Sequence, residues 1–116
     1  MKVYIAGALS SKENNNRTPS QVVVDYLRNV HDMCVVAGQI RKHGHVPFVP
    51  ALDMLLGVVN GNWDEENYRE IGMEFLEVCD AMLVISRSWG VEQEIKEAKR
   101  LCIPIYYSME ELDGRP

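Results

Sequence analysis

The chain has 116 residues, of which 47% are hydrophobic, and a formal net charge of −5. This length predicts a single domain over residues 1–116, which can bury roughly two-thirds of the surface that its unfolded chain exposes. The net negative charge, with no basic run longer than two residues, argues against nucleic-acid binding through phosphate neutralisation. No segment approaches the ~18 consecutive apolar residues of a membrane span, so we expect a cytosolic protein with neither nucleic-acid nor membrane partners.

The three cysteines, Cys34, Cys79 and Cys102, are widely spaced and lie in apolar contexts. An odd number of cysteines at such spacing is typical neither of a disulfide framework nor of a zinc site. We therefore expect reduced thiols in the core.

The first half of the chain predicts a strand, a loop, a long helix and a second strand. Residues 2–6 form a short apolar run that ends at Gly7, and the polar residues after it have no apolar period. The sequence TPSQ at residues 18–21 is a capping box with proline at the first helical position, which is a strong helix start. This helix continues to a stop near Gly44. Its apolar stripe consists of Val23, Leu27, Val30, Cys34, Ala37 and Ile40. The prolines in residues 45–50 place the second strand at an edge of the sheet.

The second half predicts two helices and two further strands. Residues 51–61 are apolar without a clear period, so we expect a loop with at most one helical turn. Asn62 is the expected cap of the next helix, with Glu65 three residues further on. The inner stripe of that helix is Tyr68, Ile71, Phe75 and Cys79. Residues 81–86 form a continuous apolar strand that is buried on both faces. A helix, a last strand at residues 103–107 and a charged tail follow.

Strands that alternate with helices imply parallel pairing through right-handed crossovers. We therefore expect an α/β fold, a three-layer sandwich around a mainly parallel sheet of four to five strands. In such sheets ligands bind beyond the carboxyl ends of the strands. This rule places residues 7–11, the segment from Pro50 onward and residues 86–91 around one cleft.

Glu94 lies on the face of its helix that should be buried. At about 100° per residue, with Val91 at zero, Glu94 falls at about 300°, inside an apolar arc. The arc is formed by Val91, Ile95, Ala98, Leu101 and Cys102. Burying an unpaired carboxylate costs several kcal/mol of hydration free energy. Glu94 therefore either satisfies free backbone N–H groups or a lysine, or it is a functional carboxylate that faces the cleft.

Several common sites are not indicated by the sequence. The loop GALSSKEN lacks the later glycines of a dinucleotide fingerprint, and no phosphate-binding loop with its Lys-Ser/Thr pair is present. Ala6 and Gly7 stand where a phospho-receiver domain needs acidic residues. The HGH sequence at residues 43–45 is better explained as a turn than as a metal site, because no third ligand is nearby.

What remains is a carboxylate at a helix start, the strand tyrosine Tyr4 and the loop before the helix. The helix N-terminus favours an ionised Glu94 whereas burial opposes ionisation, a balance that suits a reactive but charged nucleophile. Free N–H groups near Gly90 and Val91, together with the Ser88 hydroxyl, would bind a hydroxyl or a phosphate. A carboxylate beside an anchored sugar suits displacement at an anomeric carbon.

The segments KVYIAG, HGH before VPFVP, CDAMLVIS and SWGVEQEIKEA resemble the nucleoside 2-deoxyribosyltransferase-like superfamily, especially its small, poorly characterised bacterial and phage members. The resemblance spans residues 2–107, and its most specific part is the pattern S-x-G-x-x-x-E-x-x-x-A. It implies a doubly wound, flavodoxin- or Rossmann-like sheet. It also implies that the protein cleaves or transfers the deoxyribosyl group of a nucleoside or nucleotide. The reaction would retain the configuration at the anomeric carbon through a glycosyl-enzyme intermediate, and it would need no cofactor. The family forms dimers or larger rings, in which a neighbouring chain often completes the pocket.

Carried over residue by residue, the resemblance makes Glu94 the nucleophile and Tyr4 its catalytic neighbour. It makes Ser88 and Gly90 contacts to the sugar or to a 5′-phosphate. The full set of expected substrate-binding residues is Gly7, Ala8, Ser10, Glu65, Ser88, Gly90 and Val91. We expect no metal ion.

The sequence departs from this family at one position. The characterised enzymes usually carry an aspartate eight residues before the aspartate that opens the third strand, here Asp80, and that earlier position is Gly72. Glycine on the inner face of a helix costs about 1 kcal/mol relative to alanine, so we expect Gly72 to make room for a ligand or a neighbouring backbone. Glu65, two turns earlier, could replace the missing carboxylate. The alternative function is a catalytically silent nucleotide-binding module, and Asp80 is expected to be structural.

Two further expectations concern surface segments. SSKENNNR at residues 10–17, beside the cleft, is either a mobile tip or a lid over substrate. Five apolar residues crowd one short connection: Met54, Leu55, Leu56, Val58 and Val59. An exposed apolar patch of this kind usually marks an interface, so we expect self-association, most simply as an isologous dimer. In the alternative, these five residues fold back over the sheet.

Overall fold

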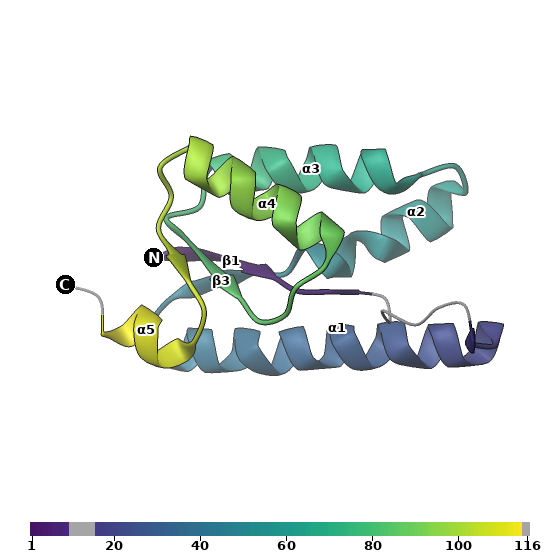
Figure 1. Cartoon of the computed structure of the whole chain (residues 1–116), viewed down its shortest axis with the longest axis horizontal. Coiled ribbons are helices and arrows are strands. Elements are labelled where there is room, and N and C mark those ends of the chain that lie inside the picture. The colour runs from purple at the N-terminus through teal and green to yellow at the C-terminus, as the bar shows by residue number, and fades with distance from the viewer. Residues whose placement is uncertain (10–15, 115–116) are drawn as a thin grey trace.

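The computed structural model describes residues 1–9 and 16–114, and its centre is a four-stranded parallel sheet (Figure 1). The strands are β1 (Lys2–Ala6), β2 (Val46–Phe48), β3 (Ala81–Val84) and β4 (Ile105–Tyr106). Their order in the sheet is β2-β1-β3-β4, so the chain moves first to one side of β1 and then to the other. This order confirms the predicted α/β fold with a parallel, doubly wound sheet. It also confirms that the proline-containing strand β2 lies at an edge.

Helices cover both faces of the sheet and complete the three layers (Figure 1). Helices α1 and α5 pack on one face, and α3 and α4 pack on the other. A 3₁₀ turn (Pro50–Asp53) and the short helix α2 connect β2 to α3. The helices are α1 (Pro19–Lys42), α2 (Met54–Asn60), α3 (Glu65–Glu77), α4 (Trp89–Arg100) and α5 (Met109–Asp113).

The two central strands are buried on both faces. For β3, this burial confirms the prediction from its continuous apolar run. In β1, Val3 and Ile5 join the core on the α1 side, whereas Tyr4 and Ala6 join the core on the α3–α4 side. The register pairs Tyr4 with Met82 of β3, which belongs to the same core. The strand period of two therefore directs the Tyr4 side chain toward α3 and α4.

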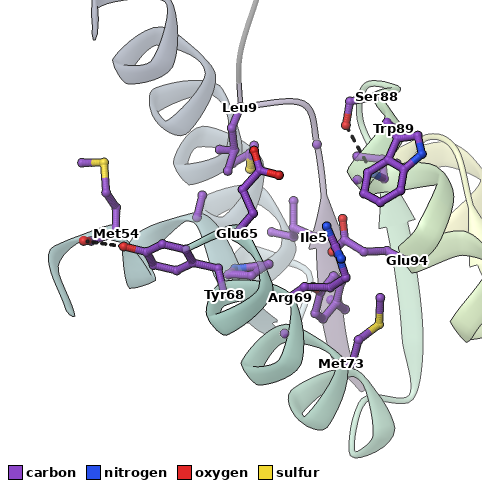
Figure 2. Close-up of a pocket in the computed structure, with 18 of the residues that line it drawn as sticks. Ile5, Leu9, Met54, Glu65, Tyr68, Arg69, Met73, Ser88, Trp89 and Glu94 are labelled. Atoms are coloured by element: carbon purple, nitrogen blue, oxygen red, sulfur yellow. Dashed lines mark hydrogen bonds between the residues drawn. The ribbon is translucent and has the colours of Figure 1, made fainter. Parts of the chain in front are cut away.

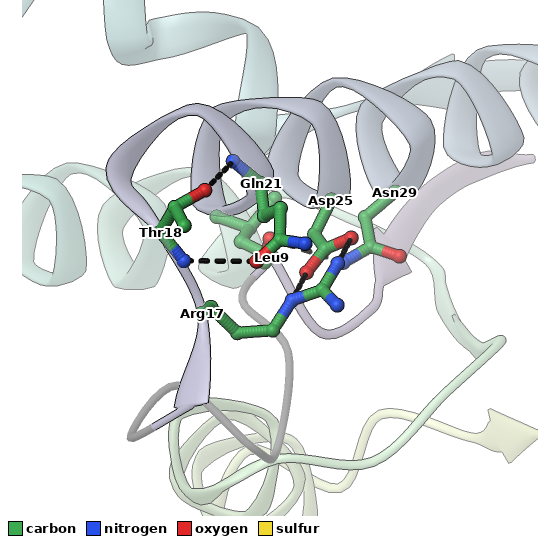
Figure 3. Close-up of polar contacts among 6 residues, drawn as sticks. All are labelled: Leu9, Arg17, Thr18, Gln21, Asp25 and Asn29. Atoms are coloured by element: carbon green, nitrogen blue, oxygen red, sulfur yellow. Dashed lines mark hydrogen bonds and ion pairs between the residues drawn. The ribbon is translucent and has the colours of Figure 1, made fainter.

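The start and the end of α1 are as predicted. The Thr18 hydroxyl accepts the N–H of Gln21 at 3.2 Å, and the Gln21 side chain accepts the N–H of Thr18 at 2.9 Å (Figure 3). The helix ends at Lys42, just before Gly44. The φ angle of Gly44 is +86°, a left-handed conformation that glycine adopts readily and that ends many helices.

The apolar stripe predicted for α1 is only partly correct. Met33 and Ile40 are buried, whereas Val23, Leu27 and Cys34 are exposed. A helix of 24 residues spans about 36 Å but a strand of five residues only about 17 Å. The N-terminal half of α1 therefore extends beyond the end of β1 (Figure 1). The sheet therefore does not reach Val23 and Leu27 on that half. Cys34 lies in the other half, about 100° around the helix from the buried Met33, and so faces away from the sheet.

Residues 10–15 lie outside the described part of the chain, so the lid expected of residues 10–17 stays a prediction. The residues on either side of this gap contact α1 (Figure 3). The Asn29 side chain donates to the carbonyl of Leu9 at 3.0 Å, and Arg17 pairs with Asp25 at 2.7 Å.

Residues 50–60 are helical, which corrects the prediction of a loop. The helix α2 ends at Gly61, whose φ angle is +78°. Its period is hidden in the sequence because the helix buries only Gly57, against which the ring of Tyr68 packs. The Tyr68 hydroxyl also donates to the carbonyl of Met54 at 3.3 Å and so joins α3 to α2. A helix without an apolar inner face gives no amphipathic signal.

Helix α3 begins after Asp64, whose carboxylate caps the first turn, and not after Asn62 as predicted. Its buried residues are Gly72 and Leu76. The predicted inner residue Phe75 is instead 47% exposed, and its ring stacks on Phe48 of the edge strand β2. The inner face is therefore displaced by about one residue, or about 100°, from the predicted stripe.

Two more predictions need correction. Of the three free cysteines, only Cys79 is buried, whereas Cys34 and Cys102 are exposed. The tail after β4 contains α5, whose Leu112 is fully buried in the core on the α1 side. A five-residue helix with one buried side chain is too short to produce a periodic pattern.

Asp80 is structural, as predicted. Its carboxylate accepts the N–H of Lys2 at 2.8 Å, and its own N–H donates to the Lys2 carbonyl at 2.8 Å. These bonds join β1 to β3 at their N-terminal ends, away from the predicted cleft. Residues 43–45 form the expected turn after α1, and His43 contacts Asp113 at 2.8 Å. In the part of the chain that the structure describes, no helix has the length and apolarity needed to cross a membrane.

Candidate active site

A cavity of about 520 Å³ lies at the carboxyl ends of β1 and β3, where topology predicts the cleft (Figure 2). Its volume is in the range of small-molecule sites. Helices α1, α2, α3 and α4 all contribute to its walls. The predicted site residues that line it are Tyr4, Gly7, Glu65, Ser88, Gly90, Val91 and Glu94.

Glu94 faces this cavity, as its position in the apolar arc of α4 predicts (Figure 2). Its neighbours on that face, Val91, Ile95 and Ala98, are buried in the core. Tyr4 is 1% exposed, and its hydroxyl hydrogen-bonds the Glu94 carboxylate. Among the described residues, the partner of this carboxylate is therefore a tyrosine from the central strand, and not a backbone N–H or a lysine.

The environment of this pair determines its protonation. Burial raises the pKa of Glu94 to about 7, although the hydrogen bond from Tyr4 acts in the opposite direction. Burial and the neighbouring Glu94 charge raise the pKa of Tyr4 far above its ordinary value. Tyr4 therefore remains a hydrogen-bond donor, while a substantial fraction of Glu94 is ionised near neutral pH.

Gly72 lines the cavity, and it makes room for the side chain of Tyr4 and not for a neighbouring backbone. Room for a ligand beside it stays a prediction. A Cβ atom at this position would lie 2.9 Å from the hydroxyl oxygen of Tyr4. Contacts this short do not occur between relaxed atoms, so any larger residue must displace Tyr4 or α3. Glycine at position 72 thus permits the hydroxyl to reach Glu94.

The start of α4 is capped by its own loop. The Ser88 hydroxyl accepts the N–H of Val91 at 3.2 Å (Figure 2). The Val91 N–H is therefore not free, which corrects the expectation that it would bind a ligand. The N–H groups of Trp89 and Gly90, in the first turn, have no partner within their helix.

The loop after β1 contributes less than predicted. Gly7 lines the cavity, and a Cβ atom there would lie 2.9 Å from the side chains of Ile85 and Met33. Ala8 is not part of the cavity wall; its N–H donates to the Ser86 hydroxyl at 2.8 Å and joins the loops after β1 and β3. Ser10 lies outside the described residues.

A family model described as "domain of unknown function (DUF4406)" matches residues 1–107. The chain belongs to this family. The match begins before β1 and extends past β4, so it contains every residue that lines the cavity. No curated protein and no solved structure gives a significant match.

The DUF4406 cavity includes residues that the sequence did not indicate. Arg69 of α3 and Trp89 of α4 both line it, and the guanidinium carbon of Arg69 lies 4.7 Å from the centre of the Trp89 ring (Figure 2). The only signals were the position of Arg69 one turn before Gly72 and that of Trp89 within the SWG sequence. Tyr26 and Met54 also line the cavity, from α1 and α2.

The described side chains of this DUF4406 domain are not arranged as the ligands of a metal ion. Within residues 1–9 and 16–114, no three His, Cys, Asp or Glu side chains gather closely enough to hold a metal ion. The other polar side chains that line the cavity carry hydroxyls, a guanidinium and the carboxylate of Glu65.

Proposed function

We propose that this DUF4406 domain cleaves or transfers the N-glycosidic bond of a nucleoside or nucleotide, with Glu94 as the nucleophile. The observation that carries the proposal is the Glu94 carboxylate, which faces a cavity of small-molecule size and is hydrogen-bonded by the buried Tyr4 hydroxyl. The resemblance of the sequence to nucleoside 2-deoxyribosyltransferase-like proteins points to the same two residues.

The environment of Glu94 suits a nucleophile. A pKa of about 7 leaves a substantial ionised fraction at neutral pH, and low hydration makes the ionised form more reactive than a solvated carboxylate. Tyr4 donates to the carboxylate and holds its orientation. Because Tyr4 stays protonated, it adds no second negative charge.

The proposed reaction has two displacements at one carbon. A Glu94 oxygen bonds to the anomeric carbon while the C–N bond breaks, and the electron pair of that bond leaves with the base. The base takes up a proton. Water or a second base then attacks the same carbon and releases Glu94, so hydrolysis and transfer share the first step and both retain configuration.

Other cavity residues have supporting roles in this proposal. Ser88 and Gly90, at the start of α4, contact the sugar or its 5′-phosphate. Gly7 borders the substrate at the end of β1. Glu65 lines the same cavity from α3. In this proposal it takes the role of the second carboxyl group, whose protonated form supplies the proton that the departing base takes up.

A catalytically silent nucleotide-binding module is the second candidate function. It is favoured by Gly72, which stands where the resembling enzymes carry an aspartate and where the Tyr4 hydroxyl fills the space. Such a module would keep the cavity and bind nucleotides without releasing a base.

We further propose that the protein forms a homo-oligomer, most simply a dimer, through the exposed apolar side of α2. Leu55, Leu56, Val58 and Val59 are all exposed, so they do not fold back over the sheet. Met54, at the start of the same helix, lines the cavity. A partner that covers α2 would therefore lie beside the substrate. Nucleotide metabolism by such an enzyme fits the cytosolic location that we expect from the sequence.

The test of the reaction is base release by Glu94→Gln. This change keeps the volume of the side chain and removes the negative charge, so release from deoxynucleosides and their monophosphates should fall on the order of 10³-fold or more. Chromatography measures the free base, and titration calorimetry checks that ligand binding persists.

Glu92→Gln is the matched control. Glu92 is on the same helix but pairs with Arg87 at 2.6 Å and does not line the cavity, so its variant should retain activity. Unimpaired turnover by Glu94→Gln would exclude the nucleophile. Binding without base release by the wild-type protein would favour the silent module.

A further inference from the structure

Arg69 differs from the other arginines that lie near carboxylates. Arg17, Arg87 and Arg100 each form an ion pair. Arg69 forms none with the described residues, although Glu65 and Glu66 stand one turn earlier on the same helix. Its guanidinium is directed instead toward Trp89 on the neighbouring helix, and both side chains line the cavity (Figure 2).

The contact with Trp89 fixes the guanidinium without using its hydrogen-bond donors. An arginine above an aromatic ring is held by cation–π attraction, while its N–H groups point outward in the plane of the guanidinium. This planar fork matches two oxygens of a phosphate or carboxylate. Trp89 is 64% exposed, so the pair lies at the mouth of the cavity, where a ligand can reach it.

The charges around the cavity make an anion the natural ligand of Arg69. Among the described residues, the charged side chains that line the cavity are Glu65, Glu94 and Arg69. Two carboxylates repel an anionic substrate unless a cation offsets them. Arg69 is the cation in this set, and it comes from α3, the helix that packs beside α4 on the same face of the sheet.

We propose that Arg69 binds the phosphate of the substrate, and that the pocket therefore selects nucleoside 5′-monophosphates over free nucleosides. This inference rests on the proposed function. The anomeric carbon must face Glu94, and the phosphate is attached at the other end of the sugar. Arg69 then determines specificity through binding, and it takes no part in the bond-breaking step.

The test compares four 2′-deoxynucleosides with their 5′-monophosphates. The wild-type protein should have the higher kcat/KM for the monophosphates. Arg69→Gln should lower the ratio of the two kcat/KM values about 10- to 100-fold, as expected for the loss of a charge-assisted hydrogen bond, mainly through KM for the monophosphate. Arg69→Lys keeps the charge but not the fork, so it should retain part of the preference.

Arg28→Gln is the matched control. Arg28 is exposed on α1 and does not line the cavity, so its removal changes the net charge equally and should leave the ratio unchanged. The monophosphate preference of the wild-type protein should also weaken as salt concentration rises.

Binding separates failure of this inference from failure of the proposed reaction. In the Glu94→Gln background, calorimetry should show tighter binding of the monophosphate than of the nucleoside, and Arg69→Gln should remove the difference. That result supports the role of Arg69 even if no base is released. Base release at equal kcat/KM from both substrate classes overturns it and leaves the reaction in place. The inference is also overturned if Arg69→Gln alters the preference among bases but leaves the ratio of kcat/KM for monophosphates to kcat/KM for nucleosides unchanged.

Discussion

At the scale of single residues, the burial of Glu94 suits the proposed reaction but lowers the stability of the folded protein near neutral pH. Its side chain has an ordinary pKa of 4.5, and burial raises this to about 7 in the folded protein. The folded state therefore binds a proton that the unfolded state has already released between these two pH values. Stability falls as pH rises through this window, because the unfolded chain binds fewer protons there.

The contribution of Glu94 can be isolated with Glu94→Gln. The free energy of unfolding of the variant minus that of the wild type should increase between about pH 4.5 and pH 7, by at most about 3 kcal/mol, and then remain constant. Base release by the wild type should rise over the upper part of the same range, because only the ionised carboxylate attacks. Tyr4→Phe removes a hydrogen bond that lowers the pKa, so it should move both transitions to higher pH.

Denaturant unfolding at several pH values measures the first effect, and a pH–rate profile measures the second. A difference between the two proteins that stays constant from pH 4 to pH 8.5 would show that Glu94 is not held in a dehydrated environment. Groups elsewhere in the chain titrate equally in both proteins and cancel.

At the scale of elements, the packing of α3 on β1 controls the Tyr4–Glu94 contact. Gly72 is the residue of α3 that faces the Tyr4 hydroxyl. Gly72→Ala should gain about 1 kcal/mol of helix propensity but lose about 1–3 kcal/mol to overpacking, a net loss of roughly 1 kcal/mol. It should also reduce base release, because Tyr4 must move away from Glu94.

Gly38→Ala is the control for this substitution. Gly38 lies in the interior of α1, and a Cβ atom there meets no other atom within 4 Å. The variant should therefore be more stable than the wild type by about 1 kcal/mol. If Gly72→Ala were as stabilising as Gly38→Ala and fully active, Tyr4 would have free space around its hydroxyl and the packing argument would fail.

At the scale of the whole molecule, the apolar side of α2 is one of the apolar surfaces that the described part of the monomer leaves uncovered. Val59 is 76% exposed, and its neighbours on α2 are similarly accessible. We expect light scattering to show a mass above that of the 13.2 kDa chain as concentration rises. Leu56→Asp should restore the monomer mass, because a carboxylate is costly to bury in an interface. It should also weaken nucleotide binding, since α2 borders the cavity.

Val35→Asp is a suitable comparison. Val35 lies on α1 and is 48% exposed, the same fraction as Leu56, so its variant controls for the added charge. A mass that stays at 13.2 kDa over the whole concentration range would rule out the dimer.

The sequence by itself determined the features that depend on neighbours along the chain. The capping box at residues 18–21 forms within four residues, and the turn at Gly44 requires only the conformational freedom of one glycine. The inward direction of Glu94 follows from its helical phase relative to Val91 and Ile95. The alternation of strands with helices was sufficient to predict a parallel sheet and the end at which its cleft lies.

Only the tertiary structure decided which side chains meet. Gly72 and Tyr4, or Arg69 and Trp89, come from different elements, and no local period relates them. The exposed half of α1 depends on where the sheet ends, and α2 is a helix that buries a single glycine. Helical phase and capping are set by bonds within about four residues. Contacts across the cavity depend instead on how whole helices pack on the sheet, which the pattern of any one helix does not specify.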